Sequence, residues 1–289
     1  GNATLQTSGN LTNQADLLAG SDLTLTAANI DNTVSGEISG RNTNLMASNT
    51  LTNRGLINGS NTFISSSSLN NLGSGRIYGD HVAIAASSVT NDKEMVSGVR
   101  FDAVIAARDR LDIGAITLIN REHALLFSLG DINIGSSLDS YYRAVGSGST
   151  LNNNSATIEA LRNIGIGAAQ INNTNEHIAY EDRVTSITPS VTEVIDANQY
   201  RTFTRTIYDP VVTQTDPGKI VAGNDIRLSA TIIINSNSQI VAGGDLNVTG
   251  TTILNQGEVG QKRLIRDRGD TWTNTPHREC HGGVFGEGQ

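Results

Sequence analysis

A repeat of about 20 residues is the feature that most constrains how this chain can fold. Each repeat begins at a glycine, continues as alternating apolar and polar residues, and ends at an asparagine 12 or 13 positions after the glycine. The four clearest units begin at Gly20, Gly40, Gly59 and Gly79. The same frame returns far downstream, from Gly223 to Asn235 and from Gly243 to Asn255. Alternation with a period of two is typical of β-strands, and a fixed register of this length indicates units that stack on one another.

We therefore expect an all-β fold, a right-handed parallel β-helix of about ten to twelve coils whose strands pair with the coils above and below. Leu23, Thr43, Thr62 and Val82 would form one inward-facing column. The recurring asparagine is expected to stack at a corner of the coil, where its side-chain amide bonds to the neighbouring coil. A helical repeat is excluded because the apolar residues show no period of 3.6.

The composition agrees with short strands joined by tight turns. Aromatic residues make up only 4% of the chain and charged residues 17%, which excludes a helical bundle and disfavours a doubly wound α/β enzyme. The formal net charge of −8 disfavours nucleic acid and anionic membrane surfaces as main partners. No apolar run has the length of a membrane span, so direct membrane insertion is not expected. The chain starts in mid-pattern, and we expect a piece of a longer protein that is monomeric in isolation and needs no cofactor.

Three interruptions of the repeat mark insertions, because a solenoid expels extra residues as loops. The distance from each asparagine to the next repeat places them at residues 92–99, 138–150 and 174–218. The longest contains two alternating stretches on either side of Asp196–Asn198, which favours a protruding β-hairpin. The chain is thus divided into regular coils at 1–91, irregular coils with insertions at 92–218, resumed coils at 219–257, and a capping segment with a flexible tail at 258–289.

The second and third insertions concentrate tyrosine, phenylalanine and arginine, which the coils largely lack. Such side chains on exposed loops are typical of protein-binding surfaces. The alternative is that the aromatic residues only pack the hairpin against the wall of the solenoid. The candidate receptor-binding residues are Tyr141, Tyr142, Arg143, Tyr180, Tyr200, Arg201, Phe203, Arg205 and Tyr208.

The remaining polar residues do not form a catalytic or metal-binding pattern. Asp22 and Asp131 fall next to the turn of their repeats, where aspartate is a common turn former, so we do not expect an enzyme. His277, Cys280 and His281 form the densest group of metal-ligand or thiolate candidates. They lie in a glycine-rich tail without matching ligands elsewhere, which favours a flexible tail over a zinc site.

Two stretches, Leu18–Leu25 and Ile240–Val248, resemble filamentous-haemagglutinin-type repeats. Such repeats occur in large exoproteins of two-partner secretion systems in Gram-negative bacteria. The order of regular repeats, an insertion-rich segment and resumed repeats is similar to the receptor-binding region of CdiA-type contact-dependent growth inhibition effectors. The resemblance implies a secreted β-helical filament, displayed on the cell surface, that grips an outer-membrane protein of a target bacterium so that a toxin is delivered. Receptor contacts follow no fixed motif in that family, so no residue role is carried over.

We therefore expect a non-catalytic recognition module that binds an outer-membrane protein receptor on a neighbouring bacterium. A host-cell adhesin of the same superfamily is the alternative. A polysaccharide-degrading β-helix enzyme is a third and weaker hypothesis.

Overall fold

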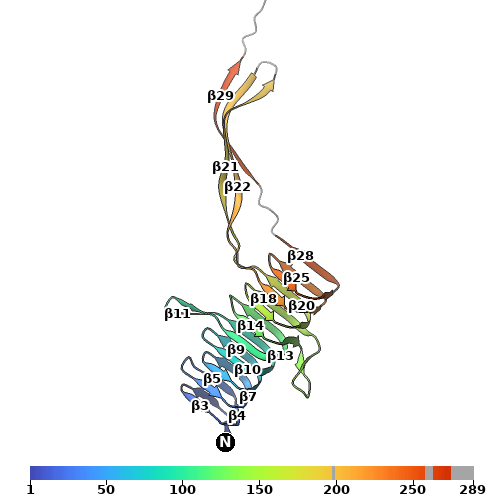
Figure 1. Cartoon of the computed structure of the whole chain (residues 1–289). Helices are drawn as coiled ribbons and strands as arrows, with labels where there is room; N and C mark the ends of the chain where they lie inside the picture. Colours follow the sequence, from blue (N-terminus) through green and yellow to red (C-terminus); the bar gives the residue numbers. More distant parts are fainter. Residues whose placement is uncertain (197–198, 258–262, 275–289) are drawn as a thin grey trace, which may run out of the picture. The chain divides into compact units, whose positions relative to one another are not determined.

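The computed structural model describes residues 1–196, 199–257 and 263–274, and these residues form two compact units. The solenoid unit contains residues 1–178 and 215–257. The sheet unit contains residues 179–196, 199–214 and 263–274. Strands account for all regular structure in the described residues, and Figure 1 labels them along the chain.

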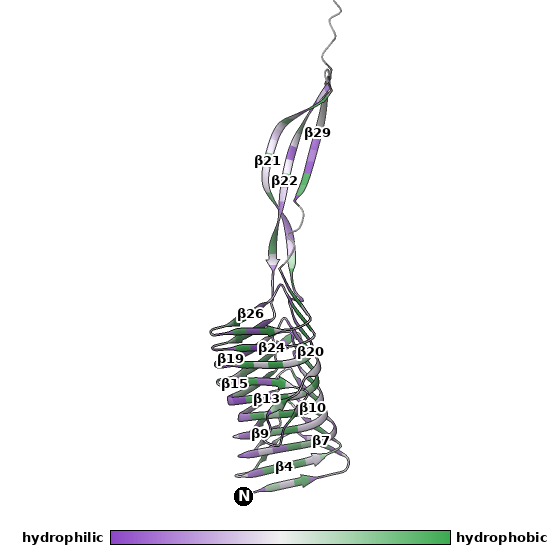
Figure 2. Cartoon of the chain, turned by 90° about the vertical axis from the view of Figure 1, so that its right-hand side faces the viewer, coloured by the Kyte–Doolittle hydropathy of each residue, from purple (hydrophilic) through white to green (hydrophobic). Residues whose placement is uncertain are grey.

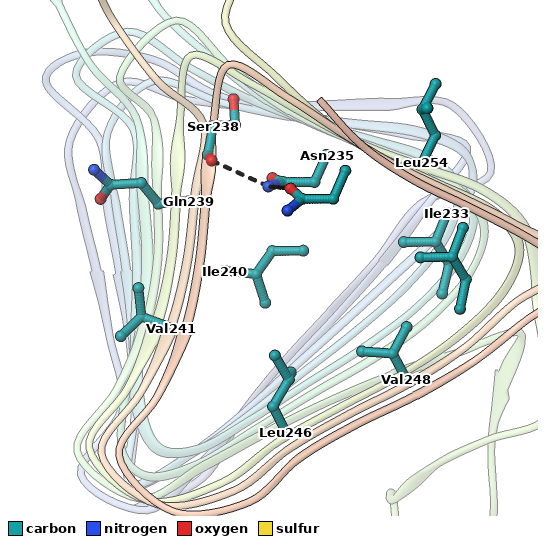
Figure 3. Close-up of a pocket in the computed structure, with 11 residues that line it drawn as sticks. Ile233, Asn235, Ser238, Gln239, Ile240, Val241, Leu246, Val248 and Leu254 are labelled. Carbon is teal, nitrogen blue, oxygen red and sulfur yellow. Dashed lines mark hydrogen bonds between the residues drawn. The ribbon is translucent and has the colours of Figure 1, made fainter. Parts of the chain in front are cut away.

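The solenoid unit is a parallel β-helix, as the repeat predicts. Each complete coil has three faces, and Figure 3 shows the triangular outline of the stacked coils. Strand β10 (Arg76–Asp92) passes over all three faces, since Arg76–Tyr78 pairs with β8 and the rest of the strand pairs with β9. Parallel pairings along the first face join ten successive coils in the described residues.

The longest strands turn corners, so they belong to more than one face. The first face contains, in stacking order, β1 (Ala3–Gln6), β4 (Asp22–Ala27), β7 (Asn42–Asn53), β9 (Asn61–Leu72), β10, β13 (Val104–Arg121), β15 (Asp131–Gly135), β20 (Ile164–Thr174), β24 (Ile226–Ser229) and β27 (Leu246–Thr249). The second face contains β2 (Asn10–Asn13), β5 (Asn29–Asn32), the later parts of β7, β9, β10 and β13, then β18 (Gly148–Asn154), the later part of β20, β25 (Ile232–Ser236) and β28 (Thr252–Gln256). The third face contains β3 (Asp16–Leu18), β6 (Glu37–Ser39), β8 (Leu56–Asn58), the first parts of β10 and β13, then β14 (Leu125–Ser128), β19 (Thr157–Ala160), β23 (Lys219–Ala222) and β26 (Gln239–Ala242).

The core of the solenoid consists of columns of small and branched apolar side chains. Leu23 pairs in register with Thr43, and the same column continues through Thr62 to Val82, so the predicted inward column is confirmed. Hydrophobic residues recur at corresponding places in successive coils (Figure 2). A second buried column contains Leu25, Leu45, Ile64, Ile84, Ile113, Ile134, Ile166 and Leu228. Burial of one such side chain contributes about 1.5–3 kcal/mol. The coil stack is stabilised by the sum of these contributions over all the buried side chains.

A continuous ladder of asparagines fills one corner of the coils. In each step the side-chain Nδ2 donates to Oδ1 of the asparagine in the next coil, as Asn91 does to Asn120 at 2.9 Å and Asn120 to Asn153 at 2.8 Å. The same Nδ2 of Asn120 also donates to the carbonyl oxygen of Thr157 at 3.0 Å. The predicted stacking is therefore confirmed, and Asn13 is a further member that the repeat pattern did not indicate. The ladder runs through Asn13, Asn32, Asn53, Asn71, Asn91, Asn120, Asn153, Asn173, Asn235 and Asn255.

Two of the three expected insertions belong to the solenoid unit. The first is an antiparallel hairpin of β11 (Glu94–Val96) and β12 (Val99–Phe101), which lies between β10 and β13. The second lies between β15 and β18 and contains the short antiparallel pair β16 (Ser137–Leu138) and β17 (Ala144–Val145). Both occur close to the positions that the interrupted spacing indicates, 92–99 and 138–150.

The third insertion forms the sheet unit together with a segment near the end of the chain. Strands β21 (Ala179–Asp196) and β22 (Gln199–Gln214) pair in antiparallel fashion, as expected for the hairpin within 174–218. Strand β29 (Leu264–Asn274) then pairs antiparallel with β22. This differs from the expectation of a capping segment and tail at 258–289, because the alternating residues of 264–274 extend the hairpin into a three-stranded sheet.

Candidate recognition surfaces

The candidate receptor-binding residues lie in two different units. Tyr141, Tyr142 and Arg143 belong to the second insertion of the solenoid unit, between β16 and β17. The other six, which begin at Tyr180 and end at Tyr208, lie on β21 and β22 of the sheet unit. The structure therefore supplies two surfaces, and each is built by its own local contacts.

In the second insertion, Asp139 organises a tight turn. Its carboxylate oxygen Oδ1 accepts from the backbone N–H groups of Tyr141 at 2.8 Å and Arg143 at 2.9 Å. Its backbone pairs with the same turn, because Asp139 N–H donates to Arg143 O at 2.9 Å. This arrangement leaves the Tyr141 side chain 77% exposed. The turn thus presents a tyrosine to solvent on a fixed backbone, as a binding residue requires.

Tyr142 has a different environment from its neighbour. Its ring lies against Phe63 on β9, with ring centroids 4.7 Å apart and planes tilted by 53°. Its backbone φ is +58°, a left-handed conformation that few residues other than glycine, asparagine and aspartate adopt readily. Half of the tyrosine, 48%, is still exposed. The local contacts therefore hold an aromatic ring at the surface at some cost in backbone strain.

Asp112 on β13 anchors this insertion to the solenoid wall. Its side chain is fully buried, and its Oδ1 accepts from Ala144 N–H at 2.9 Å. Arg110 donates to the same carboxylate from Nη2 at 3.0 Å, and His81 Nε2 lies 3.1 Å from Oδ2. Burial alone would raise the pKa of Asp112, but the hydrogen bonds from His81 and Arg110 hold the pKa below its ordinary value. Sequence reasoning missed this anchor because nothing in the repeat shows that the insertion covers the outer side of β13.

In the sheet unit, Phe203 is a packing residue and not a contact for a receptor. Its side chain is only 2% exposed. The guanidinium groups of Arg201 and Arg205 lie 5.1 Å and 5.0 Å from the centre of its ring, within the range of cation–π interactions. The expectation that Phe203 faces a partner is therefore corrected, because alternation along a strand does not tell which face the neighbouring side chains will cover.

The arginines of the sheet unit are held by carboxylates on adjacent strands. Arg205 on β22 makes two hydrogen bonds of 2.9 Å to Asp267 on β29. Arg201 Nε donates to Glu193 Oε2 on β21 at 2.8 Å. Hydrogen bonds from Arg205 lower the pKa of Asp267. These pairs link all three strands and leave the arginine side chains about one-third exposed, at 31% and 36%.

The tyrosines of the sheet unit are half-buried rather than projecting. Tyr208 lies under the guanidinium of Arg266, 5.2 Å from the ring centre. Tyr180 on β21 and Tyr200 on β22 have intermediate exposure. Together with the paired arginines they give this sheet a surface of partly buried aromatic rings and guanidinium groups.

An unexpected ionic cluster lies where the chain leaves and re-enters the solenoid unit. Glu122 is bonded by Lys93 Nζ at 2.6 Å, and His177 Nε2 lies 2.9 Å from its other oxygen. His123 Nε2 lies 2.7 Å from Asp216 Oδ2. These contacts fix the residues just before β21 and just after β22 to the coil. The repeat gives no signal for them, since they come from separate irregular segments.

The acidic residues at the turns have structural partners. Asp22 accepts from Asn42 Nδ2 at 2.7 Å, and Asp131 accepts from Asn163 Nδ2 at 2.9 Å.

A hollow of about 420 Å³ is lined by Ile240, Leu246 and Val248, which point into the coil interior in Figure 3. It is part of the apolar core of the last described coil, and none of the described residues that line it is Asp, Glu, His or Cys.

Within residues 1–196, 199–257 and 263–274, no three His, Cys, Asp or Glu side chains gather as a metal site. The same residues contain no helix that is long and apolar enough to cross a membrane. The candidate ligands His277, Cys280 and His281 lie outside the described residues.

Comparison with known proteins identifies the repeat. The family model for the haemagglutinin repeat matches residues 1–55, 128–186 and 210–273, which together cover more than half of the chain. Neither the search of curated proteins nor that of solved structures gave a match. Proteins with this repeat are secreted, cell-surface exoproteins with structural and adhesive rather than enzymatic roles. With its parallel coils and matched repeats, this chain belongs to the filamentous haemagglutinin family.

Proposed function

We propose that this chain is the recognition module of a secreted filamentous exoprotein and binds an outer-membrane protein on a neighbouring bacterium during contact-dependent growth inhibition. The family assignment supports secretion and adhesion. The insertion-rich segment supports a specific partner, because a uniform solenoid needs no such additions to act as a spacer.

One observation carries the proposal: the coil stack closes across the longest insertion. Strand β20 pairs directly with β24 and β25, although they lie more than 50 residues apart in sequence. The Asn ladder also continues, since Asn173 Nδ2 donates to Asn235 Oδ1 at 2.7 Å. In the described residues, the strands of the 179–214 segment pair with one another and with β29, and not with the coils. A segment that folds into its own sheet, with tyrosines and carboxylate-paired arginines, is best explained by recognition.

The physical role of the solenoid is to reduce the entropy that is lost on docking. The turn at Asp139 and the arginine–carboxylate pairs of the sheet unit restrict side chains before a partner arrives. Tyr141 then offers a large contact area with few rotatable bonds. The net charge of −8 favours a receptor with basic extracellular loops.

A deletion tests the proposal because the structure shows where the chain can be rejoined. Asn175 Nδ2 donates to Thr215 Oγ1 at 2.9 Å, so the two ends of the 179–214 segment lie side by side. A variant that lacks 179–214 and ends after Gly257 retains every coil that the structure describes. The intact chain and this deletion variant are each immobilised and mixed with detergent-solubilised outer membranes from related bacteria.

We expect the intact chain to retain one outer-membrane protein and the deletion variant to lose it. A Tyr141→Ala variant of the intact chain is expected to bind more weakly. Equal capture by the intact and deleted proteins would contradict the proposal. Binding to epithelial cells without capture of any bacterial envelope protein would instead support the alternative of a host-cell adhesin, which the adhesive character of the family favours.

A further inference from the structure

The sheet unit has two faces of different chemistry, and the register of its strands assigns residues to each of them. Strand β22 lies between β21 and β29 (Figure 1). Residues that pair directly across an antiparallel ladder have side chains on the same face, and neighbours along a strand point to opposite faces. Arg201, Phe203 and Arg205 therefore share one face of β22. Tyr200 and Tyr208 lie on the other face.

The first of these, which we call the ion-paired face, has a carboxylate for each of its arginines. Arg201 and Arg205 are bonded to carboxylates on the neighbouring strands. At one end of the same face, Arg263 makes two hydrogen bonds to Asp209, of 2.6 Å and 3.2 Å. A partner that covered this face would have to remove all of these ion pairs from water, which is costly. The ion-paired face is therefore poorly suited to docking.

The opposite face, which we call the tyrosine face, carries exposed aliphatic side chains. It contains Tyr200 and Tyr208 of β22, together with the residues of β21 that pair on the same side, Val184, Ile187 and Val194. Ile187 is 63% exposed and Val194 is 74% exposed. Exposed apolar side chains that gather on one face and are rimmed by polar groups mark an interaction site.

A row of threonines separates the two tyrosines along the middle strand. It consists of Thr202, Thr204 and Thr206. The Oγ1 atoms of Thr202 and Thr192 lie 3.4 Å apart, which agrees with their position on the same face. The hydroxyl groups both donate and accept hydrogen bonds, and these small side chains leave the centre of the face flat. From one tyrosine to the other the face is about 27 Å long, enough for an extended segment of about eight residues.

The tyrosine face is positively charged at its centre. Arg266 pairs with Thr206 and Arg268 with Thr204, so both arginines lie on this face. Both are exposed, and neither makes an ion pair within the residues that the structure describes. Asp182 lies on the same face, but it is at least about 14 Å away along the strands, beyond the screening length of about 8 Å at physiological salt. Free guanidinium groups are well suited to bind carboxylates in pairs of hydrogen bonds.

We propose that the tyrosine face is the docking face of the sheet unit and binds an extended acidic segment of a partner protein, with aliphatic residues and carboxylates on one side. The aliphatic residues would pack on Ile187, Val194 and the two tyrosines, while the carboxylates bond to Arg266 and Arg268. The inference rests on the proposed function, since the segment would belong to an extracellular loop of the outer-membrane protein.

The local charge decides the chemistry of this contact. The net charge of −8 acts on the approach of a partner at long range, whereas groups within a few ångströms decide what is bound. A second copy of the chain is disfavoured as the occupant, because its tyrosine face has the same positive centre. The flat, elongated row of threonines favours a peptide over a lipid surface. Arg201, Phe203 and Arg205 would then support the sheet from the side away from the partner.

Two isoleucines provide matched probes of the two faces. Ile187 lies on the tyrosine face, and Ile265, which pairs with Ile207, lies on the ion-paired face and is 50% exposed. Ile187→Ser and Ile265→Ser thus remove the same side chain from opposite sides of one sheet. A third variant combines Arg266→Gln with Arg268→Gln, which removes the charge and keeps side chains that form hydrogen bonds. Hydrogen exchange of β22 verifies that each variant retains the sheet.

The full chain and its variants are compared in two assays. The first is capture from detergent-solubilised outer membranes. The second is an array of synthetic peptides built from Val, Ile, Thr and Glu, beside the same array with Lys in place of Glu. We expect capture to weaken about fivefold or more with Ile187→Ser and with the double arginine variant, and to change less than about twofold with Ile265→Ser. On the array, the full chain should bind glutamate peptides and not their lysine counterparts.

The two proposals can fail separately. If a receptor is captured but Ile265→Ser weakens capture as much as Ile187→Ser, the docking face is wrong and the proposed function stands. If no outer-membrane protein is captured, the proposed function fails and the array decides: binding of the lysine peptides, or of no peptide, would overturn the inference. Dimers that Ile187→Ser dissociates in sedimentation would assign the face to a second copy. Binding to anionic lipid vesicles that the double arginine variant abolishes would assign it to a membrane, and either result would overturn the inference.

Discussion

Replacement of Asn120 by alanine would measure what the buried amide ladder contributes to stability. Asn120 is fully buried. The substitution removes three hydrogen bonds: the one from Asn91 Nδ2 at 2.9 Å, and those that Asn120 Nδ2 donates to Asn153 Oδ1 at 2.8 Å and to Thr157 O at 3.0 Å. Asn91 Nδ2 keeps its hydrogen bond to Leu125 O at 3.1 Å, so it loses only one of its two acceptors.

The magnitude follows from the groups that are left behind. A buried polar atom that loses its partner costs about 1–3 kcal/mol, and here the oxygens of Asn153 and Thr157 each lose one. The small cavity adds to this cost, while partial hydration reduces it. We therefore expect Asn120→Ala to lower the free energy of unfolding by about 3–5 kcal/mol.

The matched control is Asn61→Ala. Asn61 Nδ2 makes the same type of amide–amide bond, 2.8 Å to Asn42 Oδ1, but at an exposed position. Solvent can replace that bond, so the expected loss is about 0.5 kcal/mol or less.

Both variants are assayed by urea denaturation followed by circular dichroism, together with amide hydrogen exchange. In a solenoid the effect of a lost contact is largely local, so exchange should increase most in β13, which contains Asn120, and in β10 and β18, which pair with it. If Asn120→Ala were destabilised no more than Asn61→Ala, the ladder would not be a stabilising element, and the reasoning would be refuted.

Three further predictions concern single residues. Gly55→Ala should destabilise the solenoid by about 1–3 kcal/mol, because an added Cβ would lie 2.1 Å from Gly36 O. The control is Gly9→Ala, whose added Cβ would have its nearest neighbouring atom at 3.8 Å. Urea denaturation should show almost no change in the stability of this control. Phe203→Ala should cost the sheet unit about 3–5 kcal/mol, measured by the hydrogen exchange of β22; unchanged exchange would contradict its packing role. Because the folded-state pKa of Asp112 is lowered, the stability that it contributes is present above its unfolded pKa of about 3.9 and is lost as the pH falls through the lower folded value. An acid titration by NMR should therefore show the 136–147 segment detaching below about pH 4, a transition that must be absent in Asp112→Asn if the anchor is assigned correctly.

Much of the solenoid could be predicted because its interactions repeat. The 19- or 20-residue spacing that places Thr43 next to Leu23, and Thr62 next to Thr43, is the spacing of the observed register. An asparagine that recurs at the same corner of successive coils predicts a ladder of side-chain amide hydrogen bonds between those coils. Asn13 was missed although Gly1 lies 12 positions before it.

The candidate surfaces were harder to predict because they depend on contacts that occur once. Strand β29 pairs with β22 across a long sequence separation, and no periodicity reports such a pairing. Phe203 and the half-buried positions beside it alternate in the same way in sequence, but the ring of Phe203 is covered, in part by two arginines. The buried carboxylate of Asp112 likewise depends on where the second insertion lies. Local pattern therefore predicts strands and insertions, but not which outward side chains become covered.

The central claim is that the coils form one uninterrupted scaffold from which the recognition segments are inserted. Hydrogen exchange of the variant that lacks 179–214 and ends after Gly257, compared with that of the intact chain, tests it most directly. We expect the amides of β20, β24 and β25 to keep the same protection, because these strands pair with one another and not with the deleted segment. Rapid exchange of those amides in the deletion variant would show that the sheet unit holds the coils together and would contradict the account.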